Sequence, residues 1–450
     1  MLRVAVVGSG PSGVYTAQSL LQQDPGILVD VLDRLPCPYG LVRYGVAPDH
    51  EKIKSLQNTL RTVLQEPRVR FLGGVQVGAG GVPAARLAEL YHAVVYCVGA
   101  ATDRRLGIPG EDLPGSWSAT RFVSWYSAHP DAGPGGFVPE ARAAVVIGVG
   151  NVAVDVTRIL ARGAAELSPT DMPQAALAAL AASRVADIHM VGRRGPSQAR
   201  FTTKELRELG DLPDAEVVVD PQELALDPQY ADPTALPAVQ RRNVEVLRAW
   251  AARPARGAAR RIRLRFFLRP VAVLAREGRA GAVRFERTAP DGRGGVRGTG
   301  RFEDIEAQLV LRSVGYRGVP LDGLPFDAEQ GTVPHLAGRV VRDGAVVPGQ
   351  YVAGWIKRGP TGVIGTNRPC AKETVAALLA DAPALVRREL PGDPAEVLRA
   401  EGIEPVEWGG WLAIERAEAE LGASLGRGVV KLPDWESLLT AARAGAQRDG

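Results

Sequence analysis

Two glycine-rich stretches hold the residues whose types and spacing could do chemistry. Gly8-Ser9-Gly10-Pro11-Ser12-Gly13 follows a GxGxxG pattern, and Gly148-Val149-Gly150-Asn151-Val152-Ala153 follows a GxGxxA pattern. In such a pattern the first glycine makes a tight turn, the second lets the backbone approach a pyrophosphate, and the last small residue lets a helix pack closely on a strand. The positive end of that helix then faces the phosphate charge. Each stretch is therefore a candidate binding site for a dinucleotide.

The elements that must position the first stretch are present on both sides of it. Residues 2–7 are nearly all apolar, as in a central parallel strand covered on both faces, and residues 14–22 have a helical period. A second strand at residues 28–32 ends at Asp33, whose carboxylate can accept hydrogen bonds from ribose hydroxyls. An acid at this point suits NAD or FAD and disfavours a 2′-phosphate.

The segment that follows, residues 33–54, favours FAD for the first site. It is long and rich in Pro and Gly, where a plain NAD domain would have a short crossover. A loop of this length is usually functional, and it could fold over an adenosine and its isoalloxazine. The alternative is an ordered surface excursion that holds no ligand.

The second stretch has the same surroundings with the opposite charge. Residues 143–147 predict a strand, a helix runs to about Ala161, and a further strand is expected at residues 187–191. Arg193 and Arg194 then occupy the place that Asp33 has in the first site. Guanidinium groups suit bidentate recognition of a phosphate, and this charge reversal is how such folds accommodate the 2′-phosphate of NADP. The alternative is a solvated arginine pair at a strand end. The gap from Gly150 to Arg193 is about twice the usual spacing, so an insertion is expected.

Composition limits the class of protein. With 450 residues, 46% hydrophobic and 23% charged, the chain predicts a globular protein of roughly two or three domains. No run approaches the about 18 apolar residues that a membrane span needs. The first residues have the pattern of a buried strand rather than of a targeting peptide. A cytoplasmic protein is therefore expected. The three cysteines form no CxxC and the five histidines are scattered, which argues against a disulfide framework, an iron–sulfur cluster or a metal site.

Longer motifs carry a resemblance to a known family. They are "GLVRYGVAPDH" (residues 40–50), "GNVAVDVTRILA" (150–161), "VGRRGPSQARFTTKELREL" (191–209), "RSVGYRG" (312–318) and "GWIKRGPTGVIGTN" (354–367). In this order they closely resemble adrenodoxin-reductase-type ferredoxin–NADP⁺ reductases, particularly the bacterial members, and the match covers nearly the whole chain. The resemblance implies an α/β fold with two Rossmann-like dinucleotide-binding domains, the NADP domain being inserted into a discontinuous FAD domain. The FAD domain would comprise residues 1–104 and 318–450, with a C-terminal helical tail, and the NADP domain residues 105–317.

The resemblance also assigns cofactor contacts by matching position. The FAD contacts are Gly8, Gly10, Ser12, Gly13, Asp33, Leu41, Val75, Trp355, Gly362, Val363 and Ile364. The NADP contacts are Gly150, Asn151, Val152, Ala153, Arg193, Arg194, Glu205 and Gly362. Pro369 suits the first turn of a helix expected at residues 371–380.

His50 and Glu208 are the candidate catalytic residues that the resemblance implies, as a proton relay near the flavin. Hydride transfer itself needs no acid or base, so tuning the flavin environment or supplying a proton is the expected role. The alternative for His50 is a residue that begins a helix and whose ring nitrogens are hydrogen-bonded. The alternative for Glu208 is a surface acid that pairs with a nearby arginine on the same helix.

The implied activity is a ferredoxin–NADP⁺ reductase, an FAD enzyme that passes a hydride from NADPH to FAD and then single electrons to a ferredoxin-type iron–sulfur protein. Glutamate-synthase small subunits and thioredoxin reductases are rivals, but they should carry cysteine clusters or a redox CxxC. A protein that holds FAD without catalysis is the other rival, which the motifs for two nucleotides disfavour. Three departures from the family pattern are Glu51, Arg200 and the "NRPCAKETV" run (residues 367–375).

A basic segment at residues 240–269 has ten arginines and one acid, Glu245. It could steer an acidic ferredoxin to the flavin, with Arg241, Arg242 and Arg248 as the expected docking residues. Alternatively, "RRIRLRFFLR" (residues 260–269) is a strand with arginines alternating on its solvent face. No aromatic-interleaved groove accompanies the charge, so nucleic-acid binding is not expected.

Overall fold

The computed structural model describes residues 1–133, 137 and 139–446, and the chain in it forms two compact units. One unit is discontinuous and comprises Met1–Thr102 and Gly315–Gly450. The other unit comprises Asp103–Val314. We call them the split unit and the inserted unit.

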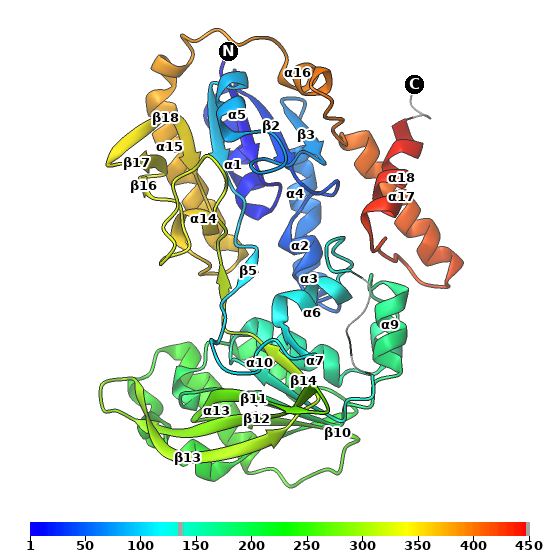
Figure 1. Ribbon diagram of the computed structural model, residues 1–450, viewed down its shortest axis with the longest axis vertical. Coiled ribbons are helices and arrows are strands. Elements are labelled where there is room, and N and C mark those ends of the chain that lie inside the picture. The colour runs from blue at the N-terminus through cyan, green and yellow to red at the C-terminus, as the bar shows by residue number, and fades with distance from the viewer. Residues whose placement is uncertain (134–136, 138, 447–450) are drawn as a thin grey trace. The chain divides into compact units, whose positions relative to one another are not determined.

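The split unit is built on a sheet with strand order β16-β17-β18-β4-β1-β2-β3 (Figure 1). The strands from β18 to β3 run parallel, and β17 and β16 add an antiparallel edge. The bounds are β1 (Arg3–Val7), β2 (Leu28–Asp33), β3 (Val69–Gly73), β4 (Ala93–Tyr96), β16 (His335–Leu336), β17 (Arg339–Arg342) and β18 (Ala345–Val352).

Both faces of this sheet are covered, as the continuous apolar run of β1 requires. Val4 and Val6 pack with helices α1 (Pro11–Gln23) and α15 (Asn367–Leu385), whereas Ala5 packs on the other face with α5 (Ala84–Leu90). Successive residues of a strand point to opposite faces, so β1 supplies both cores. This unit also contains the short helices α2 (Leu41–Tyr44), α3 (Glu51–Lys54), α4 (Leu56–Leu64) and α14 (Trp355–Arg358) and the 3-10 turn Ile364–Thr366.

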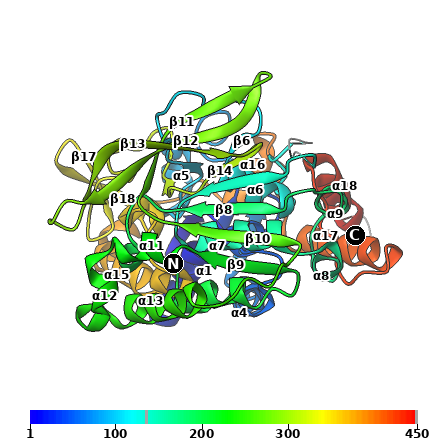
Figure 2. The ribbon, with the colours of Figure 1, turned by 90° about the horizontal axis from the view of Figure 1, so that it is seen from below.

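The inserted unit has a parallel sheet with strand order β6-β14-β7-β8-β10-β9 (Figure 2). Its strands are β6 (Ser116–Ser118), β7 (Ala143–Ile147), β8 (Asp187–Val191), β9 (Ala215–Val219), β10 (Arg260–Arg265) and β14 (Leu309–Arg312). Helices cover one face: α6 (Ala119–Tyr126), α7 (Asn151–Ala161), α8 (Ala164–Leu167), α9 (Gln174–Ala181), α10 (Thr203–Gly210), α11 (Pro221–Ala225), α12 (Pro228–Ala231) and α13 (Ala238–Ala251). The other face packs on an antiparallel sheet of β11 (Leu268–Arg276), β12 (Arg279–Pro290) and β13 (Val296–Glu306).

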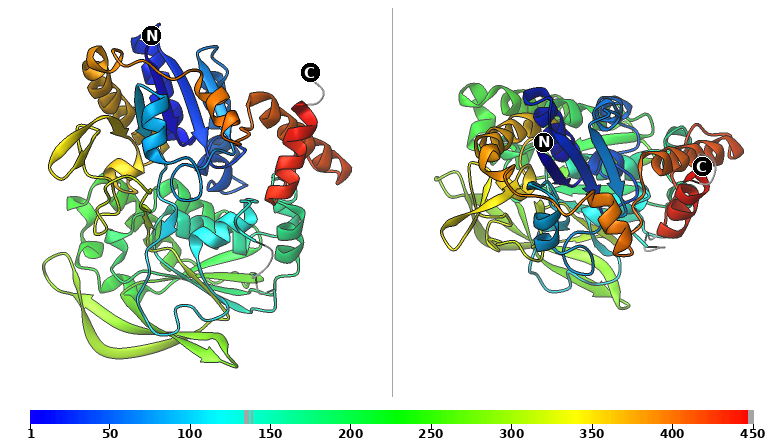
Figure 3. Two further views of the ribbon diagram at one scale, coloured as in Figure 1. Left: turned by 45° about the horizontal axis from the view of Figure 1, so that its top comes forward. Right: turned by 90° about the horizontal axis from the view of Figure 1, so that it is seen from above.

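Two short strands, β5 (Thr102–Asp103) and β15 (Tyr316–Arg317), lie where the chain passes from one unit to the other and back. The C-terminal part of the split unit is helical, with α16 (Pro394–Ala400), α17 (Trp408–Ser424) and α18 (Trp435–Ala446), and the last two lie side by side in Figure 3. Within the residues that the structure describes, no helix combines the length and the apolar character needed to cross a membrane.

The α/β fold and the strands expected around both glycine-rich stretches are confirmed. Two local predictions were wrong. The helix expected at residues 371–380 begins at Asn367, because Pro369 fits the first turn, where its missing N–H would have no partner. The strand expected at residues 260–269 ends at Arg265, and the chain turns through Phe267, whose φ is +57°, before β11 begins.

Candidate nucleotide-binding sites

The Gly8–Gly13 turn of the split unit leaves no room for side chains at its first and last glycines. A Cβ on Gly8, whose φ is +108°, would lie 2.6 Å from the carbonyl oxygen of Cys97, and a Cβ on Gly13 would lie 1.8 Å from that of Gly8. At Gly10 the nearest atom to such a Cβ is 3.8 Å away, and no side chain caps the N-terminus of α1. The turn therefore presents open backbone at the positive end of a helix, as a pyrophosphate site requires.

Asp33 lies at the end of β2, directly beside this turn. One of its carboxylate oxygens accepts hydrogen bonds from the amide and the hydroxyl of Ser9, at 2.8 and 2.6 Å, and the other accepts from the amide of Leu35 at 2.9 Å. Burial raises the pKa of Asp33, and the hydrogen bonds from Ser9 oppose that rise. Ser9 thus fixes the orientation of the carboxylate, a role that sequence reasoning did not assign.

Two distant segments of the split unit converge on the same turn. The amide of Tyr39 donates to the carbonyl of Ser9 at 3.1 Å, and a Cβ on Gly40 would lie 3.0 Å from Cα of Gly10. From the other side, a Cβ on Gly354 would lie 2.3 Å from Oγ of Ser12. The structure therefore brings the GxGxxG turn, the segment of Leu41 and the start of the residue 354–367 motif together.

The side chains around this convergence fit a bound cofactor. Val363 is 65% exposed and Leu41 is 39% exposed, although both are large and apolar. Arg358 donates through Nη2 to the side chain of Asn367 at 2.9 Å, whereas its buried Nε and Nη1 have no partner among the described residues. Exposed apolar groups beside unsatisfied cationic donors match the needs of a planar ring and its phosphates.

The other residues expected at the first site lie in the same unit. Val75 is buried and donates through its amide to the carbonyl of Asp33 at 2.9 Å, which ties the end of β3 to the end of β2. Trp355 packs against Tyr316 with ring centroids 5.4 Å apart. Gly362 has a φ of +82°, and a Cβ there would lie 2.5 Å from the hydroxyl of Thr366, so only glycine fits this turn.

The second turn, in the inserted unit, repeats this geometry. A Cβ on Gly148, whose φ is +140°, would lie 2.1 Å from the carbonyl oxygen of Ser313, whereas nothing lies within 4 Å of a Cβ on Gly150. Gly150 caps α7 without a side chain. The side-chain oxygen of Asn151 accepts from the amide of Thr202 at 2.8 Å, so the start of α7 is joined to the start of α10.

Arg193 and Arg194 lie one and two residues beyond Gly192, the position in this sheet that matches Asp33 in the other. Val7 of β1 pairs with Leu32 of β2, and Ile147 of β7 pairs with Val191 of β8. In both sheets, therefore, the strand that follows the glycine-rich turn in the sequence ends next to that turn. Helices α8 and α9 account for the long stretch of sequence between Gly150 and Arg193. No carboxylate in the described part of the chain forms an ion pair with either arginine.

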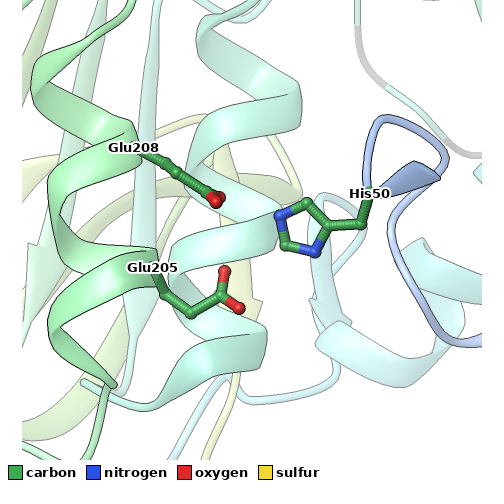
Figure 4. A group of neighbouring side chains, drawn as sticks. All are labelled: His50, Glu205 and Glu208. Carbon is green, nitrogen blue, oxygen red and sulfur yellow. The ribbon is translucent and has the colours of Figure 1, made fainter. Parts of the chain in front are cut away.

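Glu205 and Glu208 share a buried cation that sequence reasoning missed. Arg158 of α7 is fully buried, and its guanidinium lies 3.7 Å from a carboxylate oxygen of Glu205, 3.2 Å from one of Glu208 and 3.0 Å from one of Asp155. Figure 4 shows both glutamates projecting from the same side of α10. The i,i+3 spacing of Asp155 and Arg158 was the available signal, but such a pair usually lies on the surface.

His50, the other candidate catalytic residue, belongs to the split unit. Its side chain is 9% exposed, and its carbonyl accepts from the amides of Ile53 and Lys54 where α3 begins. The helix-start position expected for it is therefore present.

The basic segment divides into two groups. Arg261 and Arg263 of β10 form ion pairs with Asp187. Arg265 forms ion pairs with Glu223 and Glu303. These strand arginines therefore stabilise the folded unit. On α13, Arg248 lies over the ring of Tyr230 at 4.7 Å and donates to backbone carbonyls of α12. Arg242 is exposed and lines a cavity of about 540 Å³. Its other lining residues are Thr202, Thr203, Lys204, Arg207, Glu208, Asp211 and Val239.

The known proteins that resemble this chain in sequence and structure cover nearly all of it. The family model of the pyridine nucleotide-disulphide oxidoreductases matches residues 2–201. NADPH-ferredoxin reductase FprA of Mycobacterium tuberculosis is 44% identical over 97% of this chain and 98% of its own length. The mitochondrial NADPH:adrenodoxin oxidoreductase of Arabidopsis thaliana is 39% identical over 98% of this chain and 95% of its own length. The solved structure of Mycobacterium tuberculosis FprA in complex with NADPH superimposes with a TM-score of 0.92, covering 98% of this chain and 99% of that one.

Proposed function

This chain belongs to the family of NADPH–ferredoxin and NADPH–adrenodoxin reductases, and we propose that it transfers electrons from NADPH, through a bound FAD, to a ferredoxin-type iron–sulfur protein. The observation that carries the proposal is the opposite charge at equivalent strand ends in the two units. Asp33 follows one glycine turn, and Arg193 with Arg194 follows the other. One site thus suits a nucleotide with free ribose hydroxyls, and the other suits a 2′-phosphate.

The split unit is the proposed FAD domain. The Gly8–Gly13 turn and the N-terminus of α1 would hold the pyrophosphate, and Asp33, oriented by Ser9, would accept hydrogen bonds from the adenosine ribose. Leu41, Val75, Trp355 and residues 362–364 would surround the remainder of the cofactor. When bound, FAD supplies the chemistry of accepting two electrons together as a hydride and releasing them one at a time.

The inserted unit is the proposed NADP domain. Residues Gly150, Asn151, Val152 and Ala153 at the start of α7 would receive the pyrophosphate, and Arg193 and Arg194 the 2′-phosphate. Glu205 would contact the nucleotide with its orientation set by Arg158. The three free cysteines fit a reducing compartment, so the cytoplasm is the proposed location, which cell fractionation would test.

Anaerobic mixing with NADPH tests the function. The purified yellow protein is expected to lose its flavin absorbance with NADPH and to regain it when an oxidised ferredoxin-type protein is added, whereas NADH should bleach it far more slowly. A protein that stays yellow with NADPH would contradict the proposal.

His50 and Glu208 are proposed to tune the environment of the flavin or to supply a proton to it. Hydride transfer itself needs no acid or base, so His50→Gln and Glu208→Gln should still be bleached by NADPH, and their effect should appear in the pH dependence of turnover with a ferredoxin.

The proposed docking surface for the acidic partner comprises Arg241, Arg242 and Arg248 on α13. Removing Arg241 and Arg242 together should raise the KM for a ferredoxin by about three- to tenfold at low ionic strength, because surface charges mainly accelerate encounter. The difference should shrink at high salt, where exposed charges are screened.

Arg261→Ala with Arg263→Ala is the matched control for this prediction. It removes the same two charges from the same unit, but both guanidinium groups already pair with Asp187. Steady-state reduction of a ferredoxin across a salt series measures both variants. Equal changes in the two, or a change that is independent of salt, would remove α13 from the docking surface.

A further inference from the structure

The segment that carries Arg200 is fixed to the glycine turn of the inserted unit. The amide of Arg200 donates to the carbonyl of Val149 at 2.8 Å, and Val149 lies between the two glycines of the turn. The neighbours of Arg200 in the chain, Ala199 and Phe201, are 4% and 1% exposed. These buried residues anchor the backbone on either side, while Arg200 itself is exposed.

The end of β8 approaches the same residue. A Cβ on Gly192 would lie 3.1 Å from Cγ1 of Val149. The carbonyls of Arg193 and Arg194, which follow, accept hydrogen bonds from the hydroxyl of Thr288 at 2.8 Å and from the amide of Phe267 at 3.3 Å. Two separate segments are thus held beside Val149 through their backbones, and each carries arginine side chains.

The guanidinium groups of Arg193, Arg194 and Arg200 form a cluster of like charge, and no carboxylate among the described residues pairs with them. Over residues 1–133, 137 and 139–446, none of Arg193, Arg194 and Arg200 takes part in an ion pair. Burial, followed by the positive charges of Arg200 and Arg193, lowers the pKa of Arg194. Like charges held close together repel, so the cluster is most stable when an anion lies between them.

We propose that Arg200 supplies a third cation to the site of the 2′-phosphate, beyond Arg193 and Arg194, and thereby increases the preference of this enzyme for NADPH over NADH. The inference rests on the proposed function. A phosphate monoester carries about 1.5 to 2 negative charges at pH 7, so it can interact with more than one guanidinium.

Titration calorimetry on the FAD-loaded protein tests the proposal with adenosine 2′,5′-bisphosphate and adenosine 5′-monophosphate. Arg200→Ala should weaken binding of the bisphosphate by about three- to tenfold, less than a buried charged hydrogen bond would, because Arg200 is exposed and screened. Binding of the monophosphate should stay unchanged. Arg200→Lys should keep part of the effect, and Arg200→Glu should exceed the loss of the alanine variant.

Arg279→Ala is the matched control, since Arg279 is an exposed arginine of the same unit and is the first residue of β12. The inference is overturned if Arg200→Ala leaves bisphosphate binding unchanged, or if it weakens both nucleotides equally. Those results would leave the proposed function intact as long as the unaltered protein prefers the bisphosphate. A protein with no such preference would instead refute the NADP site itself.

Discussion

Replacing Arg193 and Arg194 together with alanine is expected to lower kcat/KM for NADPH by about 30- to 900-fold and to leave the value for NADH nearly unchanged. The range corresponds to about 2–4 kcal/mol for the pair, because hydrogen bonds to charged groups contribute about 1.5–3 kcal/mol each and Arg193 is exposed to solvent. NADH lacks the 2′-phosphate, so it has no group whose binding the arginines could support. The loss should appear mainly in KM, since the 2′-phosphate lies far from the reacting carbon and is bound equally in the ground and transition states.

The lysine double variant separates charge from shape. Arg193→Lys with Arg194→Lys keeps both positive charges but removes the planar fork that binds a phosphate through two parallel hydrogen bonds. Its kcat/KM for NADPH should therefore lie between those of the unaltered protein and the alanine variant. Steady-state kinetics with both nucleotides, using a ferredoxin or a small dye as acceptor, provide the measurement. Equal losses with NADPH and NADH would contradict a 2′-phosphate site at these arginines.

The charge contrast behind this prediction can be predicted from the sequence because it is local. A strand end and the residues just after it are marked by apolar periodicity and a change to polar residues, and parallel strands bring their carboxyl ends to one edge of a sheet. The long gap that precedes Arg193 does not hide the equivalence, since α8 and α9 fill it without altering the pairing of β7 with β8. Residue types and their spacing are therefore enough to compare the two turns.

Long-range polar contacts were not predictable in the same way. Arg158 looks like an ordinary surface residue of an amphipathic helix, and only the packing of α10 on α7 makes it a buried partner of Glu205 and Glu208. The orientation of Asp33 by Ser9 depends on the turn geometry, which residue types alone do not specify. Where charged residues meet partners far away in the chain, periodicity carries no information about the pairing.

The contact between α2 and α17 is the clearest example of such a pairing. Arg43, two residues after Leu41, donates to Glu418 at 2.5 Å, and the two side chains are 5% and 2% exposed. The guanidinium also lies over the rings of Trp411 and Tyr44, each at 5.0 Å. Burial alone would lower the pKa of Arg43, but Glu418 keeps it well above its usual value, so the arginine is charged inside the protein.

Glu418→Ala is therefore expected to destabilise the protein by about 3–5 kcal/mol, because it leaves a buried cation without its anion. It should also weaken FAD binding, since Arg43 belongs to the segment that places Leu41 and Gly40 beside the Gly8–Gly13 turn. Chemical denaturation measures the first effect. The weaker binding of FAD is measured as the rise in flavin fluorescence when FAD dissociates on dilution, at a temperature where the variant remains folded.

The same helix supplies the matched control. Glu415 of α17 pairs with Arg61, but the two side chains are 29% and 30% exposed, so Glu415→Ala removes an identical charge at a cost of about 1 kcal/mol or less. A hydrophobic pair, Arg43→Met with Glu418→Leu, should recover much of the lost stability, because it removes the buried charge together with its partner. If Glu418→Ala and Glu415→Ala destabilised the protein equally and both retained FAD, the Arg43–Glu418 contact would have no special part in holding the flavin segment, and the C-terminal helices would have to act through their apolar packing alone.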